Sequence, residues 1–209
     1  MKAVHLTSAR PITRANFQRA HRLNETGMPT TKNAHDVIAW LDVERSARYR
    51  PIATATYCNI YAYDYATLMG AYLPRVWWTE NALTRLKNGE EVGVQYGASV
   101  VEMNANALYD WFNKWGAAFG WQEVNATAAQ AHANAGKCVI GVAARKPRSS
   151  SGHIVAVAPE GELYGKAEQV NGIVLTPLQS QAGRVNFKYR TINWWKRGYE
   201  PMKWWVCAH

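Results

Sequence analysis

The stretch TATYCNIYAYDYATLMG places Cys58 between a run of β-favouring residues and an apparent helix. The first turn of a helix leaves backbone N–H groups unpaired, and the helix dipole favours negative charge there. A thiolate at that position is stabilised, and the thiolate is the nucleophilic form of cysteine. Because the predicted helix begins beside it, Cys58 is predicted to be an activated nucleophile.

A cysteine nucleophile needs a general base, and His153 has the best setting for that role. It follows the flexible segment SSSG and opens the apolar run HIVAVAP, which is typical of a strand. The imidazole can then lie at a sheet edge while the following residues anchor the backbone. The other five histidines lack this setting: His5, His21 and His35 in the N-terminal part, His132 on a polar helix face, and His209.

A third side chain is expected to fix the imidazole tautomer by accepting a hydrogen bond, a role open to Asp, Glu, Asn or Gln. Gln181 in LQSQAG is the first choice, because it lies on the strand predicted after His153. The alternatives in AEQVNG are Glu168, Gln169 and Asn171, and Glu160 is a weaker one.

The other cysteines and the absence of metal-binding motifs limit the kinds of chemistry that the sequence supports. Cys58, Cys138 and Cys207 form neither an even disulfide set nor a CxxC motif, so free thiols are expected. Cys138 lies in the apolar run KCVIGVAA, where cysteine behaves as a small hydrophobic residue, and Cys207 is interpreted in the same way. No HExxH motif and no Gly-rich phosphate loop occurs. We therefore expect no metal and no cofactor.

Helical patterns fill the first part of the chain. A short helix is predicted in ITRANFQRAHRL, another in HDVIAWLDVERSARY, and a third from about residue 59 to 72. Leu108, Trp111, Phe112 and Trp115 follow the spacing of one helix face, which predicts an amphipathic helix packed on the core. A short helix in TAAQAHANAG is predicted to end at Gly136.

Strand patterns dominate the second part. They are KCVIGVAAR, HIVAVAP, GIVLTPLQSQAG, and one or two more in INWWKRGYEPMKWWVCAH. Helices followed by strands indicate an α+β fold, with N-terminal helices packed on a C-terminal antiparallel sheet. A chain of 209 residues favours one domain, spanning 1–209.

The charge of the chain points to an anionic partner. Lys and Arg number 24 against 15 Asp and Glu, which gives a net charge of +9. Nucleic acid, an anionic membrane surface, lipopolysaccharide and the bacterial cell wall all fit this charge. No apolar stretch suits a signal peptide or a membrane span, so synthesis in the cytoplasm without a signal peptide is expected.

Three motifs, TYCNIYAYDYA, SGHIVAVAPE and QSQAGRVNF, occur in an order that resembles the papain-like cell-wall hydrolases of the NlpC/P60 and CHAP group, phage-type members above all. The resemblance covers about residues 54–187. It implies a papain-like fold with Cys58 as nucleophile, His153 as base and Gln181 as the orienting residue. The segment at about 77–136 exceeds a minimal member of the group and is expected to be a helical, Trp-rich insertion that adds core.

The resemblance also implies an activity. The expected substrate is a peptidoglycan amide, cut by an endopeptidase or an N-acetylmuramoyl-L-alanine amidase. The Cys58 backbone N–H is expected to hold the oxyanion, with Tyr57 or Asn59 as auxiliary contacts. A monomeric phage endolysin that reaches the periplasm through a holin lesion fits this activity, and so does an injected antibacterial effector.

Two other classes remain open. A lysozyme-like glycosidase needs two carboxylates, for which Glu90, Glu91, Glu102 and Asp110 are available without a marked pair. A non-enzymatic basic module for nucleic acid or lipopolysaccharide would use the tail NWWKRGYEPMKWW, which interleaves Trp with Lys and Arg. A closing strand pair is the favoured interpretation of that tail, and for a hydrolase no nucleic-acid partner is expected.

Overall fold

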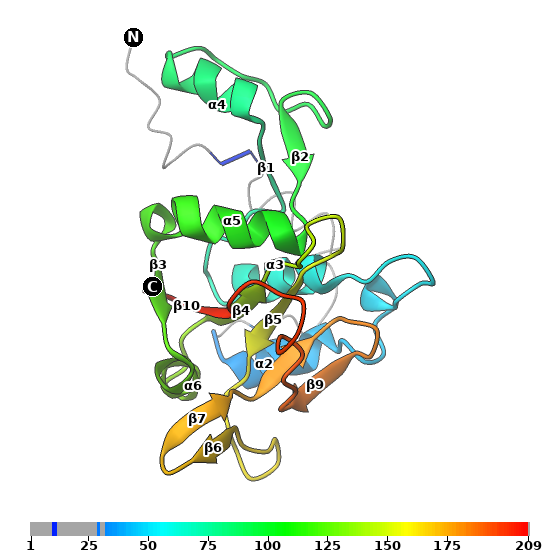
Figure 1. Ribbon diagram of the computed structural model, residues 1–209, viewed down its shortest axis with the longest axis vertical. Coiled ribbons are helices and arrows are strands. Elements are labelled where there is room, and N and C mark those ends of the chain that lie inside the picture. The colour runs from blue at the N-terminus through cyan, green and yellow to red at the C-terminus, as the bar shows by residue number, and fades with distance from the viewer. Residues whose placement is uncertain (1–9, 12–28, 30–31, 209) are drawn as a thin grey trace.

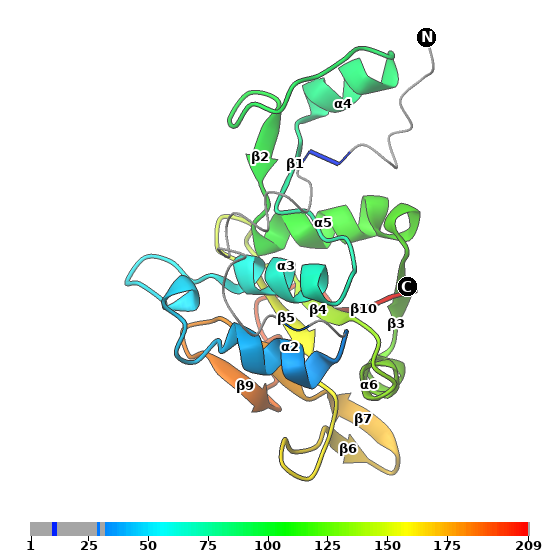
Figure 2. The same ribbon diagram turned by 180° about the vertical axis from the view of Figure 1, so that it is seen from behind.

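The computed structural model describes residues 10–11, 29 and 32–208 (Figures 1 and 2). The helix expected in ITRANFQRAHRL, residues 12–23, lies outside this range. The described α-helices are α2 (Ala34–Leu41), α3 (Cys58–Leu68), α4 (Glu80–Lys87), α5 (Ala105–Trp115) and α6 (Ala126–Asn134). Short 3-10 turns are η1 (Ala47–Tyr49) and η2 (Gly116–Phe119). In this described part, no helix has both the length and the apolar character needed to cross a bilayer.

The main sheet has six strands in the order β3-β10-β4-β5-β8-β9, and every neighbouring pair is antiparallel. The α+β class with an antiparallel sheet is therefore confirmed. Its strands are β3 (Trp121–Val124), β4 (Val139–Ala143), β5 (His153–Val157), β8 (Gln179–Gln181), β9 (Phe187–Arg190) and β10 (Lys203–Cys207). The last strand along the chain, β10, lies between β3 and β4, which are far from it in sequence.

Both faces of the sheet are covered by apolar side chains. On β5, Ile154 and Ala156 belong to the larger buried cluster, with side chains of α2, α3 and α5. Val155 and Val157 belong to a second cluster that includes alanines of α6. Successive residues of a strand point to opposite faces, so this alternation fixes β5 between two layers.

Helix α3 begins at Cys58, so the predicted position of this cysteine at a helix start is confirmed. It ends at Leu68, four residues before the expected end, because the chain reverses at Gly70 with φ of 80°. The hydroxyl of Tyr61 lies 2.5 Å from Ser180 Oγ on β8. This contact joins the helix that carries Cys58 to the strand that carries Gln181.

The strand expected across GIVLTPLQSQAG is two strands. Strand β7 (Ile173–Thr176) pairs with β6 (Glu168–Val170) in a separate hairpin, whereas β8 joins the main sheet. Pro177 lies between them and has no N–H to donate, so one continuous ladder is broken there. The C-terminal segment contributes only β10, and β9 was not predicted from the sequence.

The segment 77–136, expected to be helical, Trp-rich and an addition to the core, contains strands as well as helices. Helix α5 is part of the larger core, where Trp111 and Phe112 are only 2% and 1% exposed. Strand β3 is an edge strand of the main sheet. Strands β1 (Val76–Trp78) and β2 (Val100–Glu102) pair and, with α4, form an arm beyond α5 (Figures 1 and 2). Because β1, β2 and β3 precede α6, the simple order of helices then strands is wrong.

Replacing Phe112 with Ala is expected to destabilise the whole fold. Its ring contacts Trp111, Trp121 and Trp205, which come from α5, β3 and β10. Removing a buried phenyl ring costs about 3–5 kcal/mol, measured as the free energy of unfolding in urea. The control Leu163→Ala, at a side chain 90% exposed, should change it by less than about 0.5 kcal/mol. If the whole loss of stability instead appeared in a separate transition at lower urea concentration, α5 would unfold independently of the rest of the fold.

Candidate active site

Three elements bring the predicted catalytic side chains to one edge of the sheet. Strand β5 begins at His153, whose partner on β4 is Ala143. Strand β8 runs antiparallel on the other side of β5 and ends at Gln181. Helix α3 packs on β5 and β8, and its first residue is Cys58. The Cys58 thiol lies within electrostatic range of the His153 ring, and both residues line the same cleft.

Gln181 fixes the orientation of the imidazole. His153 Nε2 lies 2.6 Å from Gln181 Oε1, and Gln181 Nε2 donates to the Val185 carbonyl over 3.1 Å. A carbonyl can only accept, so the amide nitrogen must face Val185 and the amide oxygen must face the histidine. His153 therefore donates from Nε2 to Gln181, which leaves Nδ1 for Cys58.

The environment of Cys58 favours the thiolate. Burial raises the pKa of the Cys58 thiol, because charge is costly where water is excluded. The charge and hydrogen bond of His153, followed by backbone hydrogen bonds from Ile154 and Asn59, outweigh that cost and lower the pKa below its ordinary value. By contrast, burial raises the pKa of Cys138 well above the ordinary value, so Cys138 is a neutral core thiol as expected.

The pKa of His153 shifts in the direction opposite to that of Cys58. Burial alone lowers the pKa of the imidazole, but the charge and hydrogen bond of Cys58 and the hydrogen bond to Gln181 raise it overall. A lowered thiol pKa beside a raised imidazole pKa favours a thiolate–imidazolium pair. This pair is the protonation state that a cysteine nucleophile needs.

Trp194 covers the imidazole, a contact that sequence reasoning missed. Its ring meets His153 edge to face, with centroids 4.7 Å apart. The indole N–H donates to Oε1 of the buried Gln179 over 2.9 Å, which anchors the ring. The spacing of the tail tryptophans predicts a strand pair or a binding surface. It gives no signal that Trp194 packs on the catalytic histidine.

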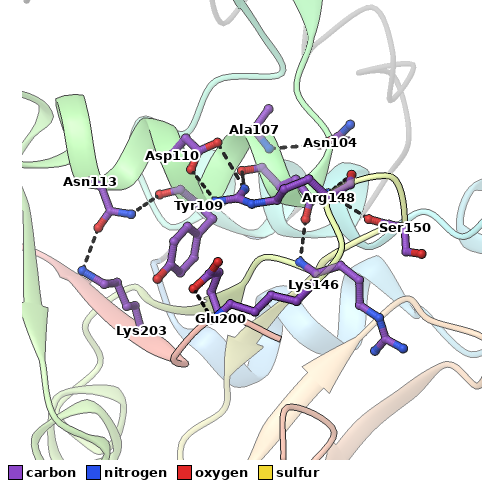
Figure 3. Close-up of polar contacts among 12 residues, drawn as sticks. Asn104, Ala107, Tyr109, Asp110, Asn113, Lys146, Arg148, Ser150, Glu200 and Lys203 are labelled. Carbon is purple, nitrogen blue, oxygen red and sulfur yellow. Dashed lines mark hydrogen bonds and ion pairs between the residues drawn. The ribbon is translucent and has the colours of Figure 1, made fainter. Parts of the chain in front are cut away.

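The loop that leads into His153 is held by helix α5. Asn106 accepts from the Arg145 backbone N–H at 2.8 Å and donates to the Arg148 and Ser150 carbonyls at 3.1 and 2.9 Å. Figure 3 shows the Arg148 guanidinium against the Asp110 carboxylate of the same helix, an ion pair of 3.1 Å. The Trp-rich helix therefore supports the site through its polar face.

Two glycines beside the site have no room for a side chain. A Cβ on Gly152 would lie 2.7 Å from the backbone oxygen of Ala143. A Cβ on Gly183 would lie 2.9 Å from Gln181 Nε2 and 3.5 Å from His153 Cε1. Glycine at both positions lets β4 and the β8 loop pack closely around the imidazole.

The alternative orienting residues do not reach this site. Glu168, Gln169 and Asn171 are exposed on the β6–β7 hairpin, outside the main sheet. Glu168 accepts from Thr176 Oγ1 at 2.8 Å, and Asn171 has the positive φ of an Asn-Gly turn. The Glu160 carboxylate accepts from Asn134 and from the Ala167 backbone. Their position near Gln181 in sequence was misleading because β6 and β7 leave the sheet.

Of the two residues predicted as auxiliary oxyanion contacts, Asn59 lines the cleft and Tyr57 does not. Asn59 Nδ2 donates to the Met103 carbonyl at 2.9 Å and lies 3.4 Å from Glu102 Oε1, so this amide ties α3 to the arm. Tyr57 is half-buried at the N-cap of α3 and is not among the residues that line the cleft. The backbone N–H groups at the helix start remain for an oxyanion.

Cys58 and His153 lie in an open cleft of about 570 Å³. Its other walls come from the segment before α3, the start of α5, the β4–β5 loop, the turn after β8 and the tail. These residues are Thr54, Ala55, Thr56, Asn59, Asn104, Ala105, Arg145, Ser150, Ser151, Gly152, Gln181, Gly183, Arg184, Ile192, Trp194 and Tyr199. Within the described ranges, no three His, Cys, Asp or Glu side chains gather in a way that could hold a metal ion.

Comparison with known proteins adds no assignment. No protein-family model matches the chain, and no curated protein matches it. The chemistry is therefore argued from the geometry of the site.

Cys58 is expected to react with iodoacetamide at neutral pH, where an ordinary thiol with a pKa of about 8.5 is mostly protonated. His153→Ala removes the cation but leaves the burial, so the pKa of Cys58 rises and alkylation shifts to higher pH. Peptide mapping by mass spectrometry assigns the modified cysteine, with Cys138 as the buried control. Identical pH profiles for wild type and His153→Ala would contradict the ion pair.

Gln181→Ala should weaken both the orientation and the basicity of His153. The lost hydrogen bond lowers the pKa of the imidazole, so the alkaline limit of thiolate–imidazolium chemistry moves to lower pH. NMR titration of the His153 ring measures this shift. The matched variant Gln169→Ala, on the exposed hairpin, should leave the titration unchanged. If the pKa of His153 in Gln181→Ala equals that of wild type, the proposed role of Gln181 in orienting the imidazole is wrong.

Proposed function

We propose that this protein is a cysteine hydrolase that cleaves an amide bond of peptidoglycan. The observation that carries the proposal is the contact of Cys58, at a helix start, with a His153 ring oriented by Gln181 in an open cleft. A nucleophile, a base and an orienting acceptor in series are the parts that acyl transfer requires.

In the first step, the Cys58 thiolate attacks the carbonyl carbon of the scissile amide and forms a C–S bond. The imidazolium of His153 gives its proton to the nitrogen, the C–N bond breaks, and the amine leaves. The acyl group remains on Cys58 as a thioester, and His153 is neutral.

In the second step, neutral His153 takes a proton from water, whose oxygen attacks the thioester carbonyl. The C–S bond breaks, the acid product leaves, and the thiolate–imidazolium pair returns. The backbone N–H of Cys58 at the start of α3 donates to the oxyanion in both steps. One such donor contributes about 3 kcal/mol of transition-state stabilisation in comparable sites.

The choice of peptidoglycan rests on two supports. The order of the three sequence motifs resembles papain-like hydrolases of the NlpC/P60 and CHAP group, and a helix start facing an antiparallel sheet fits a papain-like fold. The net charge of +9 attracts the chain to the anionic cell wall or outer-membrane surface. We propose that it acts on the wall in the periplasm as a phage endolysin or an injected effector.

The competing classes have weaker support. The tail tryptophans Trp204 and Trp205 are 5% and 6% exposed, so they offer little stacking surface to nucleic acid. Three of the carboxylates considered for a glycosidase, Glu90, Glu102 and Asp110, are ion-paired with arginines. Neither observation favours a binding module or a glycosidase over the cysteine site.

Digestion of purified peptidoglycan tests the proposal. Wild type should release fragments, while Cys58→Ala and His153→Ala should lose about a thousandfold or more of the rate. Cys138→Ala, which removes a buried thiol outside the cleft, is the matched control and should keep the activity of the folded protein. Mass spectrometry of new amine ends distinguishes cleavage at lactyl-alanine from cleavage within the stem peptide. Equal fragment yields from all variants would refute the proposal.

The rate should depend on pH through both partners of the pair. Below the lowered pKa of Cys58 the nucleophile is protonated, and above the raised pKa of His153 the leaving amine has no proton donor. The acid limb of the profile should therefore lie below the ordinary thiol pKa, and the alkaline limb above the ordinary imidazole pKa. A profile of kcat/KM against pH that rises through the ordinary thiol pKa of about 8.5 would contradict it.

A further inference from the structure

The side chains that line the cleft around Cys58 include two guanidinium groups and no carboxylate. Among its lining residues are Arg145 and Arg184, and none of them is Asp or Glu. The described part of the chain provides no ion-pair partner for either arginine, although eight other ion pairs occur elsewhere in it. A guanidinium in a cleft without a carboxylate leaves its donors for an anionic ligand.

Both guanidinium groups are held in place by other parts of the protein. Arg184 Nη1 donates to the carbonyls of Ile52 and Ala53 at 3.0 and 2.9 Å, which leaves Nε and Nη2 without a hydrogen-bond partner among the residues that the structure describes. Arg145 is half-buried, and its Cζ lies 4.4 Å from the centroid of the Tyr199 ring. A cation that is already positioned loses little side-chain entropy when it binds an anion.

The sheet places these arginines on opposite sides of the histidine. Arg145 follows the end of β4, where Ala143 pairs with His153. Arg184 follows the end of β8, on the other side of β5. Neighbouring strands are about 4.8 Å apart, so the ends of β4 and β8 flank His153 at a separation of about 10 Å. This span matches a short peptide segment on each side of a scissile amide.

We propose that Arg145 and Arg184 select substrates that carry a free carboxylate on each side of the scissile amide, and that amidation of either carboxylate weakens cleavage. This inference rests on the proposed amide hydrolysis, at a bond within the stem peptide. Peptidoglycan stem peptides supply such carboxylates on their glutamate and diaminopimelate residues, and both groups also occur as amides. Each arginine binds one of the two carboxylates through a charge-assisted hydrogen bond.

Muropeptides of defined amidation test the selection. The substrates are one with both carboxylates free, one amidated at glutamate and one amidated at diaminopimelate. Wild type should cleave the free form with a kcat/KM about tenfold above each amidated form, as expected for one charged hydrogen bond. Arg145→Gln should abolish discrimination at one carboxylate, and Arg184→Gln at the other. Arg190→Gln, an equal charge loss on exposed β9 outside the cleft, should keep both ratios.

The outcomes separate this inference from the function on which it rests. Equal cleavage of free and amidated muropeptides by wild type would overturn the selection and leave the hydrolase intact. No cleavage of any muropeptide would instead count against the proposed function. An arginine variant that slows all three muropeptides equally has only a structural role, which would also overturn the assignment of that residue. The wild-type comparison needs no variant and is independent of folding defects.

Discussion

The site depends on one electrostatic balance at Cys58. Burial opposes ionisation of the thiol, whereas His153 and two backbone hydrogen bonds favour it. The same low exposure that makes the thiolate costly also strengthens its attraction to the imidazolium. A charged pair survives there only while each partner stays in place, so the surrounding structure has to restrain the helix and the strand together.

The restraints come from every layer of the fold. Gln181 and Trp194 hold the imidazole from two directions, and Gln179 anchors the tryptophan in turn. The hydroxyl contact between Tyr61 and Ser180 fixes α3 against β8. Helix α5 secures the loop before His153 through the side chain of Asn106, although it contributes no reacting group. Such second-layer contacts determine whether a catalytic geometry is tight or loose.

The sequence was most informative where local physics decides the structure. The helix start at Cys58, the strand that opens at His153 and the apolar stripe of α5 follow from local residue pattern and periodicity, and the structure has all three. Gln181 could be preferred from the sequence, but Glu168 could not be dismissed, since β7 leaves the main sheet at Pro177 and pairs with β6 in a hairpin of its own. The roles of Asn106 and Trp194 depend on contacts between distant segments, which no single-sequence pattern encodes. The same reason applies to β3, because its pairing with the distant β10 has no signal in the sequence.

The position of β10 has a consequence for synthesis on the ribosome. Strands β3 and β4 each pair with β10, and residues 203–207 are the last of the sheet to be translated. Until then, β3 and β4 each have an unpaired edge. Trp121 lacks its partner Cys207, and Ile140 lacks its partner Trp205. Nascent chains that stall before residue 203 therefore expose two unpaired strand edges, which are templates for aggregation and targets for chaperones.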